Sequence, residues 1–273
     1  RDGTKGFGGC IFCGESGSGD FASDGNLPVF QQLKNAKNLV KNKIQSEKYI
    51  AYFQNFSSTY GNEKELYEKY LEAIAFPGVV GISIATRPDC ISEQMLLYLK
   101  SISEKTFLMI ELGFQTSNNE SVKYIRRMYE NFVLDECINR IKSTISNVHV
   151  VCHLIFGLPN ESADDMFSSI KYVLNAKTDG IKISLLHVLK NTGLANDYNS
   201  KKFACLEMNE YFQILGKALE ITPQNIVIHR LTGDGAKKNL IAPLWTANKK
   251  VVWNSMIKYF RENKIVQGKS FQP

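Results

Sequence analysis

Hydrophobic residues along this chain form short runs that alternate with longer amphipathic stretches. Five runs rich in apolar and β-branched residues are expected to be strands: residues 49–55, 79–85, 107–114, 148–156 and 180–186. Between them, apolar positions recur at helical spacing, which predicts helices over residues 27–43, 62–75, 92–103 and 163–177 and a broken helical region over 120–146. Largely apolar strands that alternate with helices are typical of a parallel sheet covered by helices.

The strand count favours a barrel over a doubly wound sheet. Five strands follow the opening loop, and a sixth, expected upstream of Arg1, would complete a partial TIM barrel of the (β/α)6 type. In either architecture, ligands bind at the C-terminal ends of the parallel strands, where the loops carry the chemistry. Arg87 and Asp89 follow one such end, where a role in the site and a simple pairing with each other are the two interpretations.

After residue 187 the alternation stops. We expect a loop over residues 190–197, a helix over 205–219, a short strand at 226–229 and an amphipathic helix over 247–261. The inward face of that last helix is predicted to carry Val252, Trp253, Met256, Ile257 and Phe260. No linker rich in Pro or Ser separates the two parts, so residues 1–187 are expected to form the barrel and residues 188–273 a basic, α-rich extension packed on it.

Charge is unevenly distributed along the chain. The formal net charge is +6, but residues 230–273 hold nine Lys or Arg against Asp234 and Glu262 and therefore carry +7. Such an excess is typical of a surface that binds a phosphate backbone, and Tyr259 and Phe271 could stack on bases if exposed. A solvated basic surface is the alternative, and the salt dependence of binding would separate the two.

The first nineteen residues contain Cys10 and Cys13, with Phe12 between them, and seven glycines. Two thiolates spaced C-x-x-C can bind one metal centre from the same side, and glycine lets the backbone approach a bulky ligand. Half of a zinc site, a redox pair and chance are the other interpretations. Zinc is disfavoured because the other cysteines are scattered singly, and a redox pair because this one is embedded in glycine.

Composition places the chain among ordinary globular proteins, with 44% hydrophobic and 22% charged residues. There is no run of about eighteen apolar residues and no apolar leader, so neither a membrane span nor a signal peptide is visible in the sequence. The six cysteines show no spacing typical of a disulfide framework. A reducing compartment, the cytoplasm, is therefore expected.

Seven segments together resemble one family: RDGTKGFGGCIFC, YFQNFSSTYG, IATRPD, ELGFQTS, HLIFGLP, HRLTGDG and LIAPLW. Their order is similar to that of the YtqA/YhcC group of radical S-adenosylmethionine (SAM) proteins, relatives of the Elongator catalytic subunit. The resemblance covers essentially the whole chain. It implies a partial TIM barrel, a [4Fe-4S] cluster held by three cysteines, and SAM cleaved to a 5′-deoxyadenosyl radical. The first of the three cysteines, and the first barrel strand before it, would lie upstream of Arg1.

The resemblance also implies roles for individual residues. Cys10 and Cys13 would bind the cluster, and Phe12 would lie near the adenine of SAM. Gln115 ends a predicted strand, and Arg127, twelve residues later, would bind the SAM carboxylate, although Arg126 beside it is equally basic.

Three further positions are assigned to cofactor binding. Gln54 and Ser57 occupy the position of the family's glycine-rich segment for the methionyl amine, although this chain has no Gly-Gly-Glu there. Glu111 is an acid within an apolar strand and is expected to contact SAM or a polar neighbour. His153 stands where related coproporphyrinogen oxidases have aspartate, and a structural role is the alternative.

These features predict a radical SAM enzyme that modifies tRNA, with maturation of the 5-substituent of wobble uridine, from carboxymethylaminomethyl to aminomethyl, as the sharpest form. The expected partners are tRNA, bound through the basic C-terminal region, and a reductant such as flavodoxin or ferredoxin. One alternative is radical SAM chemistry on a small molecule, as in coproporphyrinogen oxidases. The other is a non-catalytic iron-sulfur or zinc module that binds RNA.

Overall fold

The protein was analysed as a computed structural model, which describes residues 3–4, 7–14, 17, 22–41, 45–233 and 237–272. The described chain divides into two compact units. Unit 1 comprises residues 1–15, 114–131 and 152–273, and unit 2 comprises residues 16–113 and 132–151. The unit boundaries fall within two strands, β3 (Phe107–Gln115) and β4 (Val148–Phe156), so each of these strands contributes to both units.

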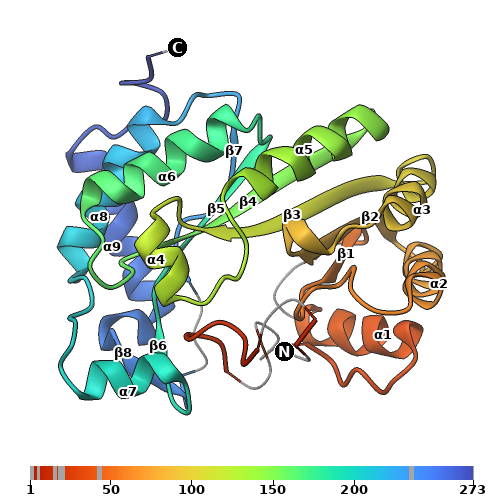
Figure 1. The fold of residues 1–273 in the computed structure, drawn as a ribbon, viewed down its shortest axis with the longest axis horizontal. Coiled ribbons are helices and arrows are strands. Elements are labelled where there is room, and N and C mark those ends of the chain that lie inside the picture. Colours follow the sequence, from red (N-terminus) through yellow and green to blue (C-terminus); the bar gives the residue numbers. More distant parts are fainter. Residues whose placement is uncertain are drawn as a thin grey trace. The chain divides into compact units, whose positions relative to one another are not determined.

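The main sheet has six strands in the order β1-β2-β3-β4-β5-β7. The remaining members are β1 (Tyr49–Phe53), β2 (Val79–Thr86), β5 (Gly180–Leu185) and β7 (Val227–Arg230). Pairing is parallel between β1 and β2, β2 and β3, and β5 and β7, and Figure 1 shows helices alternating with these strands. The predicted α/β partial barrel is confirmed. Its sixth described strand is β7, from the C-terminal part of the chain, whereas the prediction sought the sixth strand upstream of Arg1.

Two helices of unit 2 begin at side-chain caps. The described helices of this unit are α1 (Val29–Val40), α2 (Glu63–Ile74), α3 (Glu93–Ser103) and α5 (Phe132–Thr144). Asn62 accepts from the backbone N–H of Glu65, and Ser92 from that of Met95, so α2 and α3 begin where the sequence predicts. The predicted extension of α1 through residues 42–43 lies outside the described residues.

Unit 1 contains the helices α4 (Asn119–Tyr124), α6 (Ala163–Asn175), α7 (Gly193–Asn199), α8 (Met208–Ile221) and α9 (Lys249–Glu262). It also has a small antiparallel pair, β6 (Val188–Leu189) with β8 (Leu240–Ala242). A short 3-10 turn, η2 (Leu244–Ala247), precedes α9. The loop predicted over residues 190–197 is wrong, because Thr192 caps α7 by accepting from the N–H of Ala195 at 3.1 Å.

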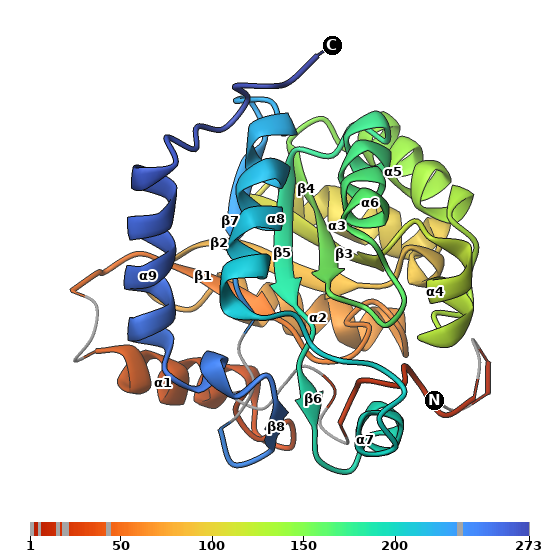
Figure 2. The same cartoon turned by 90° about the vertical axis from the view of Figure 1, so that its left-hand side faces the viewer.

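The residue range of helix α9 was predicted correctly, but the set of its side chains that are buried was not. It lies beside α8 (Figure 2), and the structure buries Val252 and Met256. Trp253 is 55% exposed and Ile257 37% exposed, so their predicted inward position is wrong. Tyr259, expected to be exposed, is half-buried with its ring 6.0 Å from that of Phe212.

Among the described residues, no helix is both long enough and apolar enough to cross a membrane.

Candidate cofactor-binding site

The cysteine pair lies in a tight turn of unit 1. The backbone N–H of Cys13 donates to the carbonyl of Cys10 at 3.1 Å, and both thiol side chains are half-buried. A turn of this kind brings the two cysteines to one end of a loop, as two ligands of one metal centre require. Among the described residues, no three His, Cys, Asp or Glu side chains gather into a metal site. The structure thus fits two ligands of the cluster that the resemblance implies.

Ile11, between the cysteines, fastens this turn to two helical segments. Its N–H donates to the carbonyl of Ile125 at 3.2 Å, and its carbonyl accepts from the N–H of Leu194 at 3.0 Å. Its side chain is buried in a cluster with Ile125, Leu194 and other apolar residues, and Phe12 packs against the same cluster. The position of the cysteines is therefore set by the loop after α4 and by α7.

The backbone of Gly193 packs directly against the side chain of Ile11. A Cβ at Gly193 would stand 2.8 Å from Cγ1 of Ile11, closer than real Cβ contacts. The absence of a side chain at this position is what lets α7 approach the cysteine turn.

Substituting Gly193→Ala is expected to displace Ile11, at an overpacking cost of about 1–3 kcal/mol, and to lower the iron content of anaerobically reconstituted protein. Gly216→Ala in α8 is the matched control, because its Cβ would also meet an isoleucine, Cδ1 of Ile265 at 3.1 Å. Iron and sulfide analysis of both variants checks the expectation. Equal iron in the two would show that the contact between Gly193 and Ile11 does not position the cysteines.

Gln115, at the C-terminal end of β3, has a left-handed backbone with φ of 68°. Such a conformation is uncommon outside glycine and persists where the surroundings impose it. The next residue, Thr116, donates through Oγ1 to Oε1 of Glu161 at 2.5 Å, and Ser169 Oγ accepts from the N–H of Ser117 at 2.8 Å. These bonds hold the strand end, and Gln115 itself is half-buried. The assignment of Gln115 to SAM remains a prediction.

Glu161 was not predicted from the sequence. Burial raises the pKa of this carboxyl group, and its Oε2 is buried without a hydrogen-bond partner among the described residues. Through its bond from Thr116, Glu161 supports the β3 end.

Arg127 does not have the surroundings expected of a ligand-binding residue. It is 1% exposed, and all five guanidinium N–H groups are used. Nη1 donates to the carbonyls of Phe114 at 2.9 Å and Thr116 at 2.8 Å. Nε and Nη2 both donate to the carbonyl of Tyr129, at 3.1 and 3.0 Å, and Nη2 also donates to Oδ1 of Asn131 at 2.6 Å.

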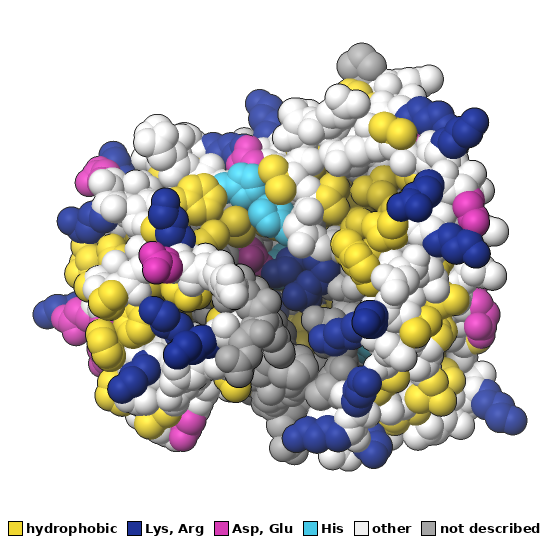
Figure 3. Space-filling view, turned by 180° about the vertical axis from the view of Figure 1, so that it is seen from behind, with side chains coloured by type: hydrophobic (Ala, Val, Ile, Leu, Met, Phe, Trp, Pro, Cys, Tyr) yellow, Lys and Arg dark blue, Asp and Glu magenta, His cyan; other side chains and the backbone are white. Residues whose placement is uncertain are grey.

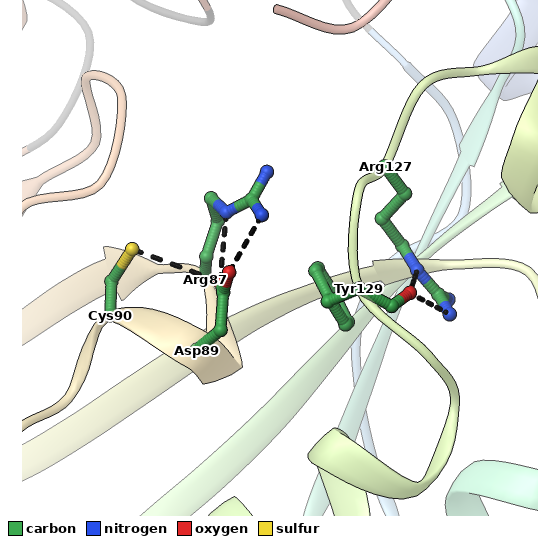
Figure 4. Close-up of polar contacts among 5 residues, drawn as sticks. All are labelled: Arg87, Asp89, Cys90, Arg127 and Tyr129. Carbon is green, nitrogen blue, oxygen red and sulfur yellow. Dashed lines mark hydrogen bonds and ion pairs between the residues drawn. The ribbon is translucent and has the colours of Figure 1, made fainter. Parts of the chain in front are cut away.

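The two bonds from Arg127 to Tyr129 are drawn in Figure 4. The guanidinium carbon also lies 4.7 Å from the ring centre of Phe114 and 4.3 Å from that of Tyr129. With every donor engaged, this arginine offers no N–H to a carboxylate. In this structure Arg127 holds the segment after β3, and its assignment to the SAM carboxylate stays a prediction.

Arg126 has the opposite surroundings. Its side chain is exposed, its φ is 58°, and its Nη1 lies 3.9 Å from where a Cβ on Gly8 would stand. The left-handed backbone turns two consecutive arginines to different environments, one buried and one beside the cysteine loop. If an arginine of this pair binds a carboxylate, Arg126 is the one with free donors among the described residues.

In unit 2, the loop after β1 is fixed by hydrogen bonds. The N–H of Ser58 donates to the carbonyl of Ala85 at 3.0 Å, and Oγ1 of Thr59 lies 2.6 Å from Oγ1 of Thr86. Gln54 and Ser57 are both half-buried in this loop. Oδ1 of Asn55, between them, is buried and has no hydrogen-bond partner among the described residues. An unsatisfied acceptor costs free energy unless a donor arrives, and an ammonium group would supply one.

Asn55 is thus a second residue that sequence reasoning missed, although it lies within the segment singled out for the methionyl amine. The letters QNFSS indicate a polar loop, but only packing shows which oxygen is left without a donor. The roles of Gln54 and Ser57 stay predictions.

Glu111 has the polar partners that a buried acid needs. It is 5% exposed; Tyr52 Oη donates to its Oε2 at 2.8 Å, and Ser83 Oγ donates to its Oε1 at 2.8 Å. These bonds connect β1, β2 and β3 within unit 2. A contact with SAM stays a prediction, and the structure by itself shows a carboxylate that joins three strands.

Arg87 and Asp89 pair with each other at the end of β2. Nε and Nη2 of Arg87 donate to the two carboxylate oxygens of Asp89 at 2.9 and 2.8 Å (Figure 4). His153 is half-buried on β4, and its assignment to the cofactor stays a prediction.

The comparisons define the class of protein first. A sequence model described as the radical SAM superfamily matches residues 6–173, and a model of the radical SAM C-terminal domain matches residues 178–262. The chain belongs to the radical SAM superfamily, which confirms the resemblance seen in its motifs, and it is an enzyme of that class by fold and family. Membership implies the [4Fe-4S] cluster and SAM as cofactors.

Within the superfamily, the chain is 39% identical over 272 residues to YtqA of Bacillus subtilis (strain 168), covering 100% of this chain and 84% of YtqA. It is 30% identical over 274 residues to YhcC of Escherichia coli (strain K12), covering 98% of this chain and 85% of YhcC. Among solved structures, archaeal Elp3 from Methanocaldococcus infernus with an N-terminal deletion superposes with a TM-score of 0.70 at 17% identity. That superposition covers 89% of this chain and 61% of the Elp3 chain, and it supports the fold alone.

Proposed function

We propose that this protein is a radical SAM enzyme that modifies tRNA. In its most specific form, the proposal is that the enzyme converts the substituent at carbon 5 of the wobble uridine from carboxymethylaminomethyl to aminomethyl. The observation that carries the radical chemistry is the turn from Cys10 to Cys13, fastened through Ile11 to Ile125 and Leu194 in a chain of this superfamily. A cytoplasmic location, as expected from the sequence, is part of the proposal.

When bound, the cluster and SAM supply a 5′-deoxyadenosyl radical that abstracts hydrogen from the substrate. Unit 1 provides two cluster ligands, Cys10 and Cys13, and the exposed Arg126, whose planar guanidinium suits a carboxylate. An external electron donor, such as flavodoxin or ferredoxin, completes the requirements of this chemistry.

Two observations support RNA as the substrate. Residues 230–273 carry a net charge of +7, and Figure 3 shows a face with Lys and Arg side chains spread among hydrophobic ones. The second is the resemblance of the chain's motifs to a group of proteins related to the Elongator catalytic subunit, from which the wobble-uridine form of the proposal comes. A polyanion with accessible bases fits a basic surface of this kind.

The test has two arms. Protein expressed from the whole gene and reconstituted anaerobically is expected to release 5′-deoxyadenosine from SAM once reduced. A deletion strain is expected to accumulate the carboxymethylaminomethyl nucleoside and to lack products made from the aminomethyl form, as measured by nucleoside mass spectrometry. Release of 5′-deoxyadenosine with an unchanged nucleoside profile would favour a small-molecule substrate. No 5′-deoxyadenosine above background would favour a non-catalytic module.

A further inference from the structure

The exposed side of α9 combines features that α-helices on protein surfaces rarely carry together. Trp253 is 55% exposed and Ile257 37% exposed, while Val252 and Met256 form the buried side. Exposed large apolar groups that cluster on one surface usually mark a site of interaction. Tryptophan in particular is highly buried on average, so its exposure requires an explanation in terms of what covers it.

Positive charge surrounds these two residues. At about 100° per residue, Lys250, Trp253, Ile257 and Arg261 lie within roughly 80° of arc on the same side of the helix. Lys250 and Arg261 are exposed and form no ion pair with any described residue. The helix has four cationic residues and one acid, Glu262, which lies 3.8 Å from Nζ of Lys258. We call Lys250, Trp253, Ile257 and Arg261 the α9 outer face.

We propose that the α9 outer face binds a single-stranded segment of RNA, with Trp253 stacked on a base and with Lys250 and Arg261 at the flanking phosphates. Proteins that bind single strands combine these two elements, because every base has a face for stacking and every linkage has a negative charge. The inference rests on the proposed RNA substrate and assigns a surface to it.

A membrane surface fits this face less well. Helices that lie in a bilayer interface bury a broad apolar side, whereas α9 directs Val252 and Met256 into the protein against its own neighbours, including α8. On the α9 outer face Trp253 and Ile257 are the apolar residues left for lipid, since the exposed Val251 lies on another side of the helix, and cations lie at both ends of the pair. The charge therefore favours a polyanion that also offers a flat aromatic group.

The test compares a triple variant, Lys250→Glu with Trp253→Ala and Arg261→Glu, with wild type in binding an oligouridine and an unmodified tRNA transcript. The dissociation constant is expected to rise at least tenfold. The slope of log affinity against log salt should become shallower by about 1.4–1.8, for two lost phosphate contacts. Trp253→Ala alone is expected to weaken binding by roughly 5- to 150-fold, from the stacking free energy of one base.

The matched control places the same changes on α1 of unit 2: Lys34→Glu with Leu39→Ala and Lys41→Glu. These residues are also exposed, and the change in net charge is the same. Equal losses in the two triple variants would overturn the inference, since net charge alone would then explain them. An unchanged affinity of the α9 variant for RNA would also overturn the inference. So would a wild-type protein that binds anionic phosphatidylglycerol vesicles through α9 and does not bind RNA.

A second measurement uses fluorescence. The chain has two tryptophans, so a Trp245→Phe background isolates the emission of Trp253. Quenching of that emission by oligouridine is expected, and its absence under conditions of binding would exclude stacking on Trp253. Binding and SAM cleavage are measured separately. If the protein binds RNA through α9 but its deletion leaves the nucleosides unchanged, the proposed function is wrong. The assignment of the α9 outer face to RNA binding would still hold.

Discussion

Replacing Cys13 by alanine is expected to abolish cluster binding and, with it, cleavage of SAM; Cys10→Ala should behave in the same way. The turn closed by the bond from Cys13 N–H to the carbonyl of Cys10 presents two cluster ligands together. Loss of an outer-shell partner of a metal ligand commonly costs 10–100-fold, so loss of a ligand itself is expected to cost more than about 100-fold in activity. The measurements are iron and sulfide per chain, visible absorbance, and 5′-deoxyadenosine production.

Cys205→Ala is the control for this experiment. Cys205 is half-buried like the two proposed ligands, and it packs against the hydrophobic cluster that contains Ile11. Burial, together with the charge of Glu207, raises the pKa of its thiol to about 11, so it is a poor thiolate donor near neutral pH. Iron should be retained in this variant. Equal iron in Cys13→Ala and wild type would contradict the cluster assignment, and zinc in place of iron would favour the non-catalytic alternative.

Replacing Arg127 by alanine is expected to lower the free energy of unfolding by several kcal/mol, because each buried carbonyl that loses its donor costs about 1–3 kcal/mol. The substitution would leave the carbonyls of Phe114, Thr116 and Tyr129 without their charged donor. Arg127→Lys should recover only part of the loss, because a lysine ammonium cannot reproduce the planar fork. Urea unfolding of the cofactor-free protein measures the difference.

Arg126→Ala separates stability from binding. Because this arginine is exposed, its removal should change the free energy of unfolding by less than about 0.5 kcal/mol. SAM affinity, measured by equilibrium dialysis, should fall instead. A stable Arg127→Ala variant with weak SAM binding would support the SAM assignment of Arg127 and contradict its structural role.

The two arginines show how far sequence reasoning reaches. The resemblance and the spacing from Gln115 single out this segment, but the sequence of two adjacent arginines does not tell which of them is buried. That outcome depends on the left-handed backbone of Arg126 and on carbonyls around the β3 end. Asn55 and Glu161 escaped for the same reason, since a single unpaired oxygen is a product of packing.

The strands were predictable because their burial on both faces leaves continuous apolar runs, as in β3 and β4. Helix α7 was not predicted, because a glycine such as Gly193 at its start is typical of a loop. The sequence does not show that Ile11 packs against this glycine. Trp253 was misplaced because helical periodicity assigns every large apolar residue to the core. Trp253, which lies on the solvent side of its helix, breaks that rule.

The attachment of Ile11 also limits how members of this superfamily can be recombined. One of its backbone partners, Ile125, falls within the segment matched by the first family model, and the other, Leu194, within the segment matched by the C-terminal model. A chimera joined between residues 173 and 178 would combine an Ile11 from one parent with a Gly193–Leu194 pair from another. Such hybrids should inherit a working cysteine turn only when these positions are transplanted together, so the unit of exchange is a three-dimensional contact and not a contiguous half of the gene.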